Sequence, residues 1–323
     1  MALIKIDQNT GIPLVGAIAF GIIDRGTNLI QVRATTVCNQ KCTYCSTNAN
    51  NNAVHPVNFE VDVDYLLAYV KEVVTYKGTG IEANIDSVGE PTAYPHLVKL
   101  VHGLKKIAGI QKVSMQTNGS LLTQEKIIEL EKAGLDHMNL SINTFDAELA
   151  KKLSGLPTYD LERIKQVAHW VAGTKIQLLL APVWFPDVNE QGIRDLITFA
   201  KQLNAKIGIQ KYEIYAYSRK VRGVKPITYW QFYKKLEELE REFDVQLIVK
   251  ASDFGISKAK RLPTKMDVGD KIHVETKIRG WGKDQMIGSI HNRAVTINNC
   301  SKQGMVRARV VENKNNIYLA EIV

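Results

Sequence analysis

Three of the four cysteines lie within eight residues of one another, and this cluster constrains the fold more than any other feature of the sequence. Cys38, Cys42 and Cys45 have a C-x3-C-x2-C spacing, and Cys300 is the only other cysteine. Three clustered thiols cannot pair among themselves, so a framework of paired disulfides is excluded. Thiolates this close together on a loop can instead share one soft metal ion or one iron–sulfur cluster.

The number of thiols distinguishes between these two kinds of site. Structural zinc sites are four-coordinate and commonly use pairs of C-x2-C or C-x4-C arms, so a zinc site here would lack one ligand. A 4Fe–4S cluster held by three cysteines leaves one iron open to bind a substrate. The alternatives are a zinc knuckle or three unrelated buried thiols. His55 could be a fourth ligand, but a lone histidine in a polar loop is more often solvated, and we expect it to be exposed.

From residue 29 to residue 215 the chain alternates between short apolar strands and amphipathic helices. Strands are expected at 29–33, 81–85, 111–116, 137–142, 175–181 and 206–215. Helices are expected at 64–76, 96–107, 123–133, 161–172 and 190–203. This alternation is typical of parallel βα architectures, and it predicts an α/β fold, a partial (β/α)6 TIM-like barrel that is open on one side.

Polar segments follow the first four expected strands, at the ends where such barrels carry their functional residues. The cysteine loop follows the first strand. The other three segments are Gly89-Glu90, Thr117-Asn118 and Ser141-Ile142-Asn143. Agreement between the strand pattern and the placement of these segments is stronger evidence for this architecture than any single motif.

The cysteine loop, with an aromatic residue before its last cysteine, resembles the cluster loop of the radical S-adenosylmethionine (radical SAM) enzymes. In that family the open iron binds the methionine moiety of S-adenosylmethionine. Reductive cleavage then yields a 5′-deoxyadenosyl radical, which abstracts a hydrogen atom from the substrate. The resemblance implies that Cys38, Cys42 and Cys45 hold a 4Fe–4S cluster, that S-adenosylmethionine is a cofactor, and that an electron donor such as ferredoxin or flavodoxin is a partner.

The segments at the strand ends resemble the S-adenosylmethionine contacts of the same family. Gly89-Glu90 is similar to its glycine-glutamate motif, although Ser87-Val88 stands where many members have glycines. The turn after the third strand resembles the Thr-Asn-Gly turn of the molybdopterin-cyclase branch, and the next segment resembles its Ser-Leu-Asp. The contacts implied by the resemblance are Tyr44, Gly89, Glu90, Thr117, Asn118, Ser141 and Asn143.

The pattern changes beyond residue 217. A charged amphipathic helix is expected at 228–243, and a basic, polar linker with Pro263 follows it. Five short strands are then expected at 271–277, 285–291, 293–297, 304–311 and 317–323, which suits a small all-β barrel. The expected segments are an N-terminal strand extension (1–28), the radical SAM barrel (29–217), a helix and linker (218–266) and the small barrel (267–323).

The small barrel resembles TRAM domains, which are OB-like barrels that bind tRNA or rRNA on RNA-modifying enzymes. The resemblance rests on Asp267-Val268-Gly269-Asp270 and on Asn316-Ile317-Tyr318-Leu319-Ala320-Glu321. Charge is concentrated in the same region: residues 246–323 hold 14 Lys and Arg against 7 Asp and Glu, whereas the other 245 residues hold 28 against 26. Phosphates and exposed bases suit such a surface, with a solvated basic face as the alternative. The residues expected to contact RNA are Arg279, Trp281, Lys283, Arg307 and Arg309.

The composition is ordinary for a soluble globular protein. Its hydrophobic content is 45%, its charged content is 23%, and no apolar run reaches the length of a membrane span. Few cysteines and a cluster loop predict a reducing cytoplasm, and Cys300 is expected to be a small buried hydrophobe.

Three functions remain open. The first is a radical SAM enzyme that modifies tRNA or rRNA. The second is the same chemistry on a peptide or small metabolite, with the tail as a lid or contact module. The third is a non-enzymatic metal-binding protein that binds nucleic acid, which the matches at four strand ends argue against.

Overall fold

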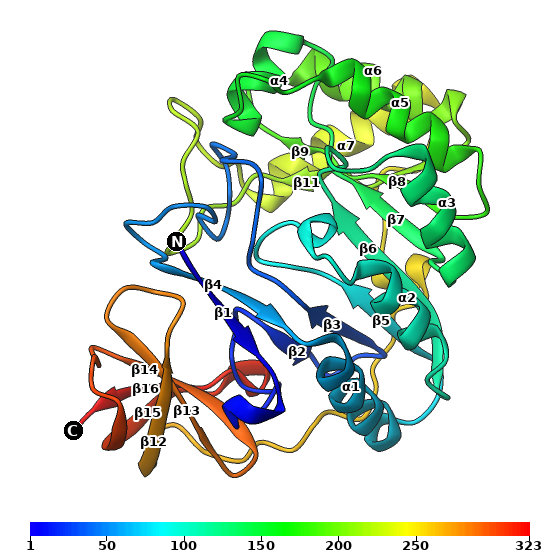
Figure 1. Cartoon of the computed structure of the whole chain (residues 1–323). Coiled ribbons are helices and arrows are strands. Elements are labelled where there is room, and N and C mark those ends of the chain that lie inside the picture. The colour runs from blue at the N-terminus through cyan, green and yellow to red at the C-terminus, as the bar shows by residue number, and fades with distance from the viewer. The chain divides into compact units, whose positions relative to one another are not determined.

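Two compact units make up the computed structural model, which describes all residues 1–323 (Figure 1). Unit 1 comprises Met1–Cys38, Ala49–Val113 and Ile256–Val323, and unit 2 comprises Asn39–Asn48 and Ser114–Gly255. The four segments expected from the sequence divide the chain differently, and they stay a prediction. None of the helices combines the length and the apolar character that a membrane crossing requires.

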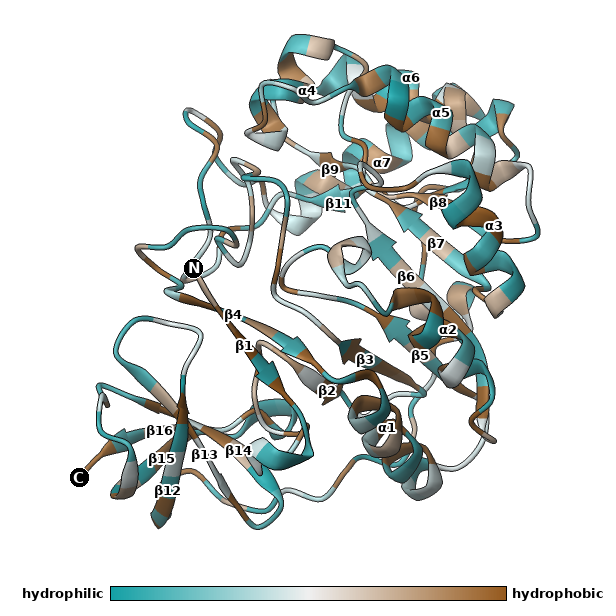
Figure 2. Ribbon diagram, viewed as in Figure 1, coloured by the Kyte–Doolittle hydropathy of each residue, from teal (hydrophilic) through white to brown (hydrophobic).

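Unit 1 contains an α/β layer. Its elements are β1 (Ala2–Ile6), β2 (Gly21–Asp24), β3 (Leu29–Arg33), β4 (Val57–Val61), α1 (Val63–Lys77), β5 (Ile81–Ile85) and α2 (Leu97–Lys105). β3 pairs in parallel with β5 and antiparallel with β2, and β1 pairs in parallel with β4. The helices α1 and α2 bury one apolar face each, which is seen as brown beside teal in Figure 2.

Unit 1 also contains a closed barrel with the strand order β12-β13-β14-β16-β15. Its strands are β12 (Lys271–Arg279), β13 (Gln285–Ile290), β14 (Arg293–Asn298), β15 (Gly304–Glu312) and β16 (Leu319–Ile322). Alternate residues point inward, and Val295, Ile297 and Tyr318 pack in the barrel core together with Cys300. The five expected strands and the buried state of Cys300 are therefore confirmed.

The N-terminal segment is hydrogen-bonded to this barrel. The amide of Tyr318 donates to the carbonyl of Gly16 (2.9 Å), and the amide of Ala294 donates to the carbonyl of Val15 (2.8 Å). The segment expected to be a linker is also fixed, because the amide of Ala259 donates to the carbonyl of Gly26 (3.0 Å). Within unit 1 the barrel is thus held to the N-terminal segment by main-chain hydrogen bonds as well as by its connecting segment.

Unit 2 is a layer of parallel strands with helices. Its elements are the second half of β6 (Ile110–Thr117), α3 (Gln124–Ala133), β7 (His137–Leu140), α4 (Ala147–Ser154), α5 (Leu161–Ala172), β8 (Gln177–Leu180), β9 (Val183–Trp184), α6 (Glu190–Gln202), β10 (Lys206–Ile207), β11 (Gln210–Lys211) and α7 (Tyr229–Phe243). Adjacent strands in the order β10-β8-β7-β6 are parallel, and β9 pairs with β11. A mixed α/β fold is confirmed, and these parallel strands fit a partial TIM-like barrel.

Two details of unit 2 differ from the sequence-based expectations. The strand expected at 206–215 is replaced by β10 and β11, which are two residues long each. The helix α4 was not expected, although its ends carry local signals: Asp146 accepts the amides of Glu148 and Leu149, and Gly155 forms a left-handed C-cap.

The interior of unit 1 corrects two expectations. His55 is 2% exposed rather than solvated, and Trp281 is 8% exposed. Their rings stack with centroids 3.6 Å apart and an angle of 8° between their planes. The amide of Lys283 donates to the carbonyl of Val54 (3.1 Å), so the 49–56 loop lies against the barrel and covers the tryptophan. Trp281 is therefore not available to stack on a base, whereas Arg279, Lys283, Arg307 and Arg309 are exposed.

A buried ion pair ties three parts of unit 1 together. The side chains of Lys77 and Asp24 are 0% exposed, and their charged atoms lie 2.8 Å apart. Lys77 also donates to the carbonyl of Lys260 (2.8 Å), and Asp24 accepts the amide of Leu262 (2.7 Å). Helix α1, strand β2 and the segment that leads to the barrel therefore meet at one pair of charges.

Replacement of Lys77 by methionine should lower the free energy of unfolding by about 3–5 kcal/mol, because Asp24 would keep a buried charge without its partner. Urea denaturation followed by circular dichroism measures the change. Lys99→Met is the matched control, because the Lys99–Asp64 pair is exposed and such pairs contribute about 0–1 kcal/mol. Equal losses in the two variants would contradict this view of the buried pair.

Candidate active site

In unit 1, the turn after β5 lies directly against the residues that precede Cys38. The amide of Glu90 donates to the carbonyl of Val37 (2.7 Å), and the hydroxyl of Ser87 donates to the carbonyl of Thr35. A Cβ atom on Gly89 would collide with the carbonyl oxygens of Thr36 and Val37, so only glycine allows this approach. The Gly89-Glu90 motif therefore adjoins the start of the cysteine loop.

The side chain of Glu90 is 3% exposed and caps the short helix that follows it. Its Oε1 accepts the amide of Thr92 (2.9 Å) and the hydroxyl of Thr92 (2.6 Å). Buried carboxylates are rarely tolerated without such partners. Glu90 therefore has a local structural role in addition to any contact with a ligand.

In unit 2, the C-terminus of helix α4 anchors the cysteine loop. The last carbonyls of a helix have no partner within the helix. Here the carbonyl of Ser154 accepts the amide of Lys41 (3.1 Å), and the carbonyl of Leu153 accepts the amide of Thr43 (2.8 Å). The next residue, Gly155, has φ +63°, and a Cβ atom there would collide with the carbonyl of Lys41. The unexpected helix α4 is thus part of the loop's support.

Arg219 holds the same loop from another side. Its amide donates to the carbonyl of Cys45 (2.9 Å), and its guanidinium donates to the carbonyl of Cys42 (3.0 Å). The hydroxyl of Ser218 donates to the carbonyl of Ser46 (3.3 Å). The segment between β11 and α7 therefore fixes the backbone on which two of the three clustered cysteines stand.

Asn39 connects the cysteine loop to the end of β6. Its side-chain amide donates to the hydroxyl of Ser120 (2.8 Å), and its side-chain oxygen accepts from the amide of Asn118 (3.0 Å). Asn118 also accepts the backbone amide (3.0 Å) and the hydroxyl (2.6 Å) of Ser120. Three polar side chains from two segments thus form one network at the carboxyl end of a parallel strand.

Tyr44 connects the loop to the end of β7. The side-chain amide of Asn143 donates to its hydroxyl (2.7 Å), and the side-chain oxygen of Asn143 accepts the amide of Val183 (2.8 Å). Burial, followed by the charge of Cys42, raises the pKa of Tyr44 well above its usual value. The same two causes raise the pKa of Tyr159, so both phenols stay neutral beside the loop at physiological pH.

The structure therefore places the expected site residues in two groups. Gly89 and Glu90 adjoin Cys38 in unit 1. The remaining expected contacts lie at the loop or at the adjacent ends of β6 and β7 in unit 2: Tyr44, Thr117, Asn118, Ser141 and Asn143. Cys38, Cys42 and Cys45 are half-buried, and none of them forms a disulfide. With the side chains as they stand, no three or more His, Cys, Asp or Glu residues are grouped so that they could hold one metal ion.

Sequence reasoning did not assign roles to Asn39 and Arg219. Asn39 lies inside the cysteine motif, and this position could have indicated a role in the site. Arg219 lies outside every periodic element and is brought to the loop only by the fold.

Comparison with known families identifies the fold that carries these residues. Residues 32–200 match the model of the Radical SAM superfamily. The chain belongs to the radical SAM superfamily. Members of this superfamily are enzymes that use a 4Fe–4S cluster and S-adenosylmethionine, and these are the cofactors of the chain.

Relatives in the superfamily differ in how much of the chain they share. The uncharacterized protein MJ0103 of Methanocaldococcus jannaschii is 36% identical over an alignment 345 residues long, gaps included. The alignment covers 98% of this chain and 80% of that protein. The GTP 3′,8-cyclase of Clostridium perfringens is 27% identical over 176 residues, or 54% of this chain and 52% of the cyclase. The chain therefore spans about half the length of that relative.

A solved structure shares the fold. The crystal structure of Streptococcus suis SuiB bound to S-adenosylmethionine has a TM-score of 0.53, with 17% sequence identity. The similarity covers 77% of this chain and 51% of SuiB.

The cysteine loop fits the cluster that the superfamily uses. Its three thiols are partly accessible and lie on a backbone that is fixed by outside groups, whereas Cys300 is 3% exposed in the barrel core. Partly exposed thiols are typical of cysteines that bind metals, whereas structural buried thiols are inert.

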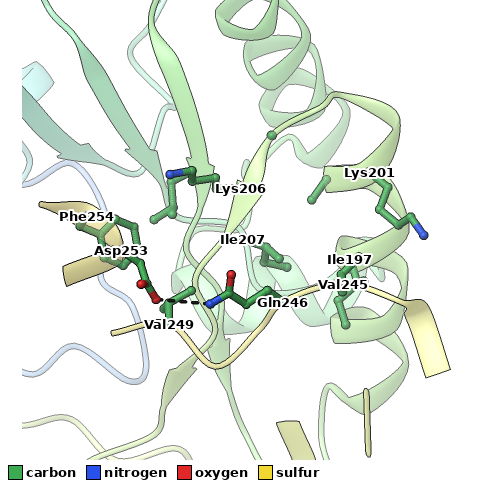
Figure 3. Close-up of a pocket in the computed structure, with 12 residues that line it drawn as sticks. Ile197, Lys201, Lys206, Ile207, Val245, Gln246, Val249, Asp253 and Phe254 are labelled. Atoms are coloured by element: carbon green, nitrogen blue, oxygen red, sulfur yellow. Dashed lines mark hydrogen bonds between the residues drawn. The ribbon is translucent and has the colours of Figure 1, made fainter. Parts of the chain in front are cut away.

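A pocket of about 240 Å³ lies elsewhere in unit 2 (Figure 3). It is lined mainly by aliphatic side chains such as Ile197, Ile207 and Val249, and the side chains of Gln246 and Asp253 point toward each other across it at 3.3 Å. None of the expected site residues lines it. The pocket is therefore separate from the radical SAM motifs.

Replacement of Arg219 by glutamine should loosen the cysteine loop. A hydrogen bond from a charged donor contributes about 1.5–3 kcal/mol, which corresponds to opening of the loop about 10 to 150 times more readily. Release of iron from anaerobically reconstituted protein to a coloured chelator should accelerate accordingly. Arg222→Gln, an exposed arginine three residues away, is the control, and iron release at the normal rate from the Arg219 variant would contradict the assignment.

Proposed function

We propose that this radical SAM enzyme modifies tRNA or rRNA, with the cluster on Cys38, Cys42 and Cys45. When bound, the cluster and S-adenosylmethionine supply reductive cleavage that yields a 5′-deoxyadenosyl radical. The fixed backbone of the cysteine loop supports this assignment, because ligands of a cofactor must be held in place by their surroundings.

The S-adenosylmethionine contacts are proposed at the strand ends. Gly89 and Glu90 would receive the amino group, and Thr117 and Asn118 the carboxylate. Ser141 and Asn143 would lie near the ribose, and the backbone of Tyr44 near the adenine. The hydrogen bonds among Asn39, Asn118 and Ser120 support this proposal, because they orient polar groups before any ligand arrives.

The observation that carries the RNA proposal is a basic face on the small barrel. On the outer surface of β12 and β15, Lys271 stands opposite Arg309 and His273 stands opposite Arg307. All four side chains are exposed. Two acidic side chains adjoin this group: Glu321 stands opposite Arg309, and Glu275 follows His273 on the same face of β12. Lys271 and Arg309 are like charges directly opposite each other, and such pairs destabilise a sheet. Phosphate groups would relieve this repulsion, so a nucleic-acid backbone is a ligand of suitable charge.

Further partners follow from this proposal. The barrel would serve as a TRAM-like RNA-binding domain, with Arg279 and Lys283 as additional phosphate contacts. An electron donor such as ferredoxin or flavodoxin would reduce the cluster. A cytoplasmic location is part of this proposal, because such a cluster needs a reducing environment.

A second candidate is the same chemistry on a small metabolite or a peptide. The similarity to the GTP 3′,8-cyclases favours a purine nucleotide, since those relatives act on GTP and share about half of the chain. On this alternative the small barrel would be a lid or contact module.

The reaction is tested with protein that is reconstituted anaerobically. We expect about four irons per chain, 5′-deoxyadenosine on reduction with S-adenosylmethionine, and loss of both when Cys38, Cys42 or Cys45 is replaced by alanine. Nucleoside analysis of RNA from a deletion strain should then reveal a missing modification. Stoichiometric zinc without sulfide would refute the cluster assignment. Turnover of GTP with unchanged RNA would favour the second candidate.

The basic face predicts a strong dependence of RNA binding on salt. The slope of log affinity against log salt should become shallower by about 0.7–0.9 for each phosphate contact that is removed, so Arg307→Gln and Arg309→Gln should each have this effect. Fluorescence anisotropy with tRNA at several salt concentrations measures the slope. Lys71→Gln, an exposed lysine on α1, should leave it unchanged. Identical slopes for all variants would show that the barrel does not hold the RNA.

A further inference from the structure

Exposed aromatic side chains are concentrated in one short stretch of unit 2. Of the six exposed Tyr, Trp and Phe side chains in the chain, five lie between residues 215 and 233. We call these five residues the aromatic surface: Tyr215 (57% exposed), Tyr217 (58%), Tyr229 (53%), Trp230 (69%) and Tyr233 (43%). They belong to the yellow-green loop after β11 and to the first turns of α7 (Figure 1). Large aromatics gathered in solvent indicate an interaction site.

Hydrogen bonds and ring contacts join three residues of the aromatic surface: Tyr215, Tyr229 and Tyr233. The hydroxyls of Tyr215 (2.6 Å) and Tyr229 (2.9 Å) both donate to the carboxylate of Glu213. The ring of Tyr229 stacks on that of Tyr233, with centroids 6.2 Å apart, and the Lys211 ammonium lies 4.6 Å from the centre of the Tyr229 ring. The loop and the helix are therefore joined through these rings, and Tyr217 and Trp230 lie within two residues of them in the sequence.

The charge of this region is mainly positive. Residues 214–235 contain six Lys and Arg and no Asp or Glu. Glu213, which lies between Tyr215 and Tyr229, stays ionised, because hydrogen bonds from Tyr215, Tyr229 and Lys211 hold its pKa below its usual range. Its charge is paired with that of Lys211 at 3.3 Å. Five of the six cations are exposed side chains of the loop and helix that carry the rings, namely Lys220, Arg222, Lys225, Lys234 and Lys235. Exposed positive charge therefore predominates along the segment that carries the aromatic surface.

The same segment touches the cysteine loop. Ser218 and Arg219, which lie between Tyr217 and Lys220, donate hydrogen bonds to the carbonyls of Cys42, Cys45 and Ser46. A ligand on the aromatic surface would therefore lie beside the backbone that carries two of the clustered cysteines. This position suits a substrate better than a distant partner.

We propose that the aromatic surface binds an unpaired RNA segment, with bases stacked on its rings and phosphates paired with its lysines and arginines. Base–aromatic stacking in a cationic groove is the general means by which proteins hold single strands. The complementary charge selects an anionic chain over a second copy of this basic protein. The inference rests on the proposed RNA substrate, and it adds a second contact beside the cysteine loop to the phosphate contacts of the small barrel.

The test uses the full-length protein and a fluorescein-labelled single-stranded RNA of mixed sequence, about 15 nucleotides long. Tyr217→Ala and Trp230→Ala should each weaken binding about tenfold, and the double variant by more, as measured by fluorescence anisotropy. Trp230→Phe should bind nearly as well as the unmodified protein, because it keeps a ring. Tyr76→Ala, which removes the exposed aromatic that lies in unit 1, should have no effect. Thermal melting confirms that each variant is folded.

Binding of duplex RNA of the same length distinguishes a failure of the aromatic surface from a failure of the proposed function. Its bases are stacked inside the helix, so the aromatic variants should leave duplex binding unchanged, whereas Arg309→Gln should weaken binding of both forms. Unchanged single-strand binding in the folded double variant would overturn the aromatic surface as an RNA site and leave the proposed function standing. Failure of the unmodified protein to bind either form would overturn both. Vesicles of phosphatidylserine and phosphatidylcholine are the last comparison: binding to vesicles that depends on Trp230, with RNA binding that does not, would identify a membrane contact instead.

Discussion

Main-chain hydrogen bonds to the cysteine loop are the constraint on which the candidate site depends. The loop has no helix or strand of its own, so ordering it requires groups outside it to offset the lost conformational entropy. The C-terminal carbonyls of α4, the guanidinium of Arg219 and the side chains of Asn118 and Ser120 supply these groups within unit 2. These anchors bind the backbone of the loop or the side chain of Asn39. The thiols of Cys42 and Cys45 hydrogen-bond within the loop, to the side chains of Gln40 and Thr47.

Much of the regular structure could be predicted from the sequence, and the failures have identifiable causes. The strand at 29–33 and the helix at 161–172 were correct to the residue, since both have strong periodicity and the helix is capped by Asp160. Helix α4 was missed because it has eight residues and only a short apolar stripe, which leaves little periodic signal. The stack of His55 on Trp281 joins residues 226 apart in sequence, and nothing in the local sequence of either residue indicates it. The same holds for the candidate site: the sequence predicted the residues at strand ends, because they follow periodic elements, but it did not predict Arg219.

Net charge proved a weaker guide than the position of each charge. The excess of lysine and arginine beyond residue 245 includes groups that serve the fold, such as Arg293, which is 7% exposed and donates to the carbonyl of Pro263. By contrast, residues 214–235 of unit 2 contain six Lys and Arg and no Asp or Glu. The net charge summed over the first 245 residues is nearly neutral and does not reveal this segment. Averages over long windows conceal such short runs, because neighbouring acidic helices cancel them. Structural placement is needed to say which cations face solvent and which rings lie among them.

The pairing of Val15 and Gly16 with Ala294 and Tyr318 has a consequence for the order of events during synthesis. These partners are separated by some 280 to 300 residues, among the longest sequence separations that this chain contains. At a ribosome that adds about 5–20 residues per second, the N-terminal segment waits tens of seconds for its partners, with its apolar residues unprotected in the meantime. Contacts of such long range close slowly, because loop closure entropy must be lost before they form. Unit 1 can therefore be completed only after β16 has been synthesised, and until then the N-terminal segment lacks its partners in the barrel.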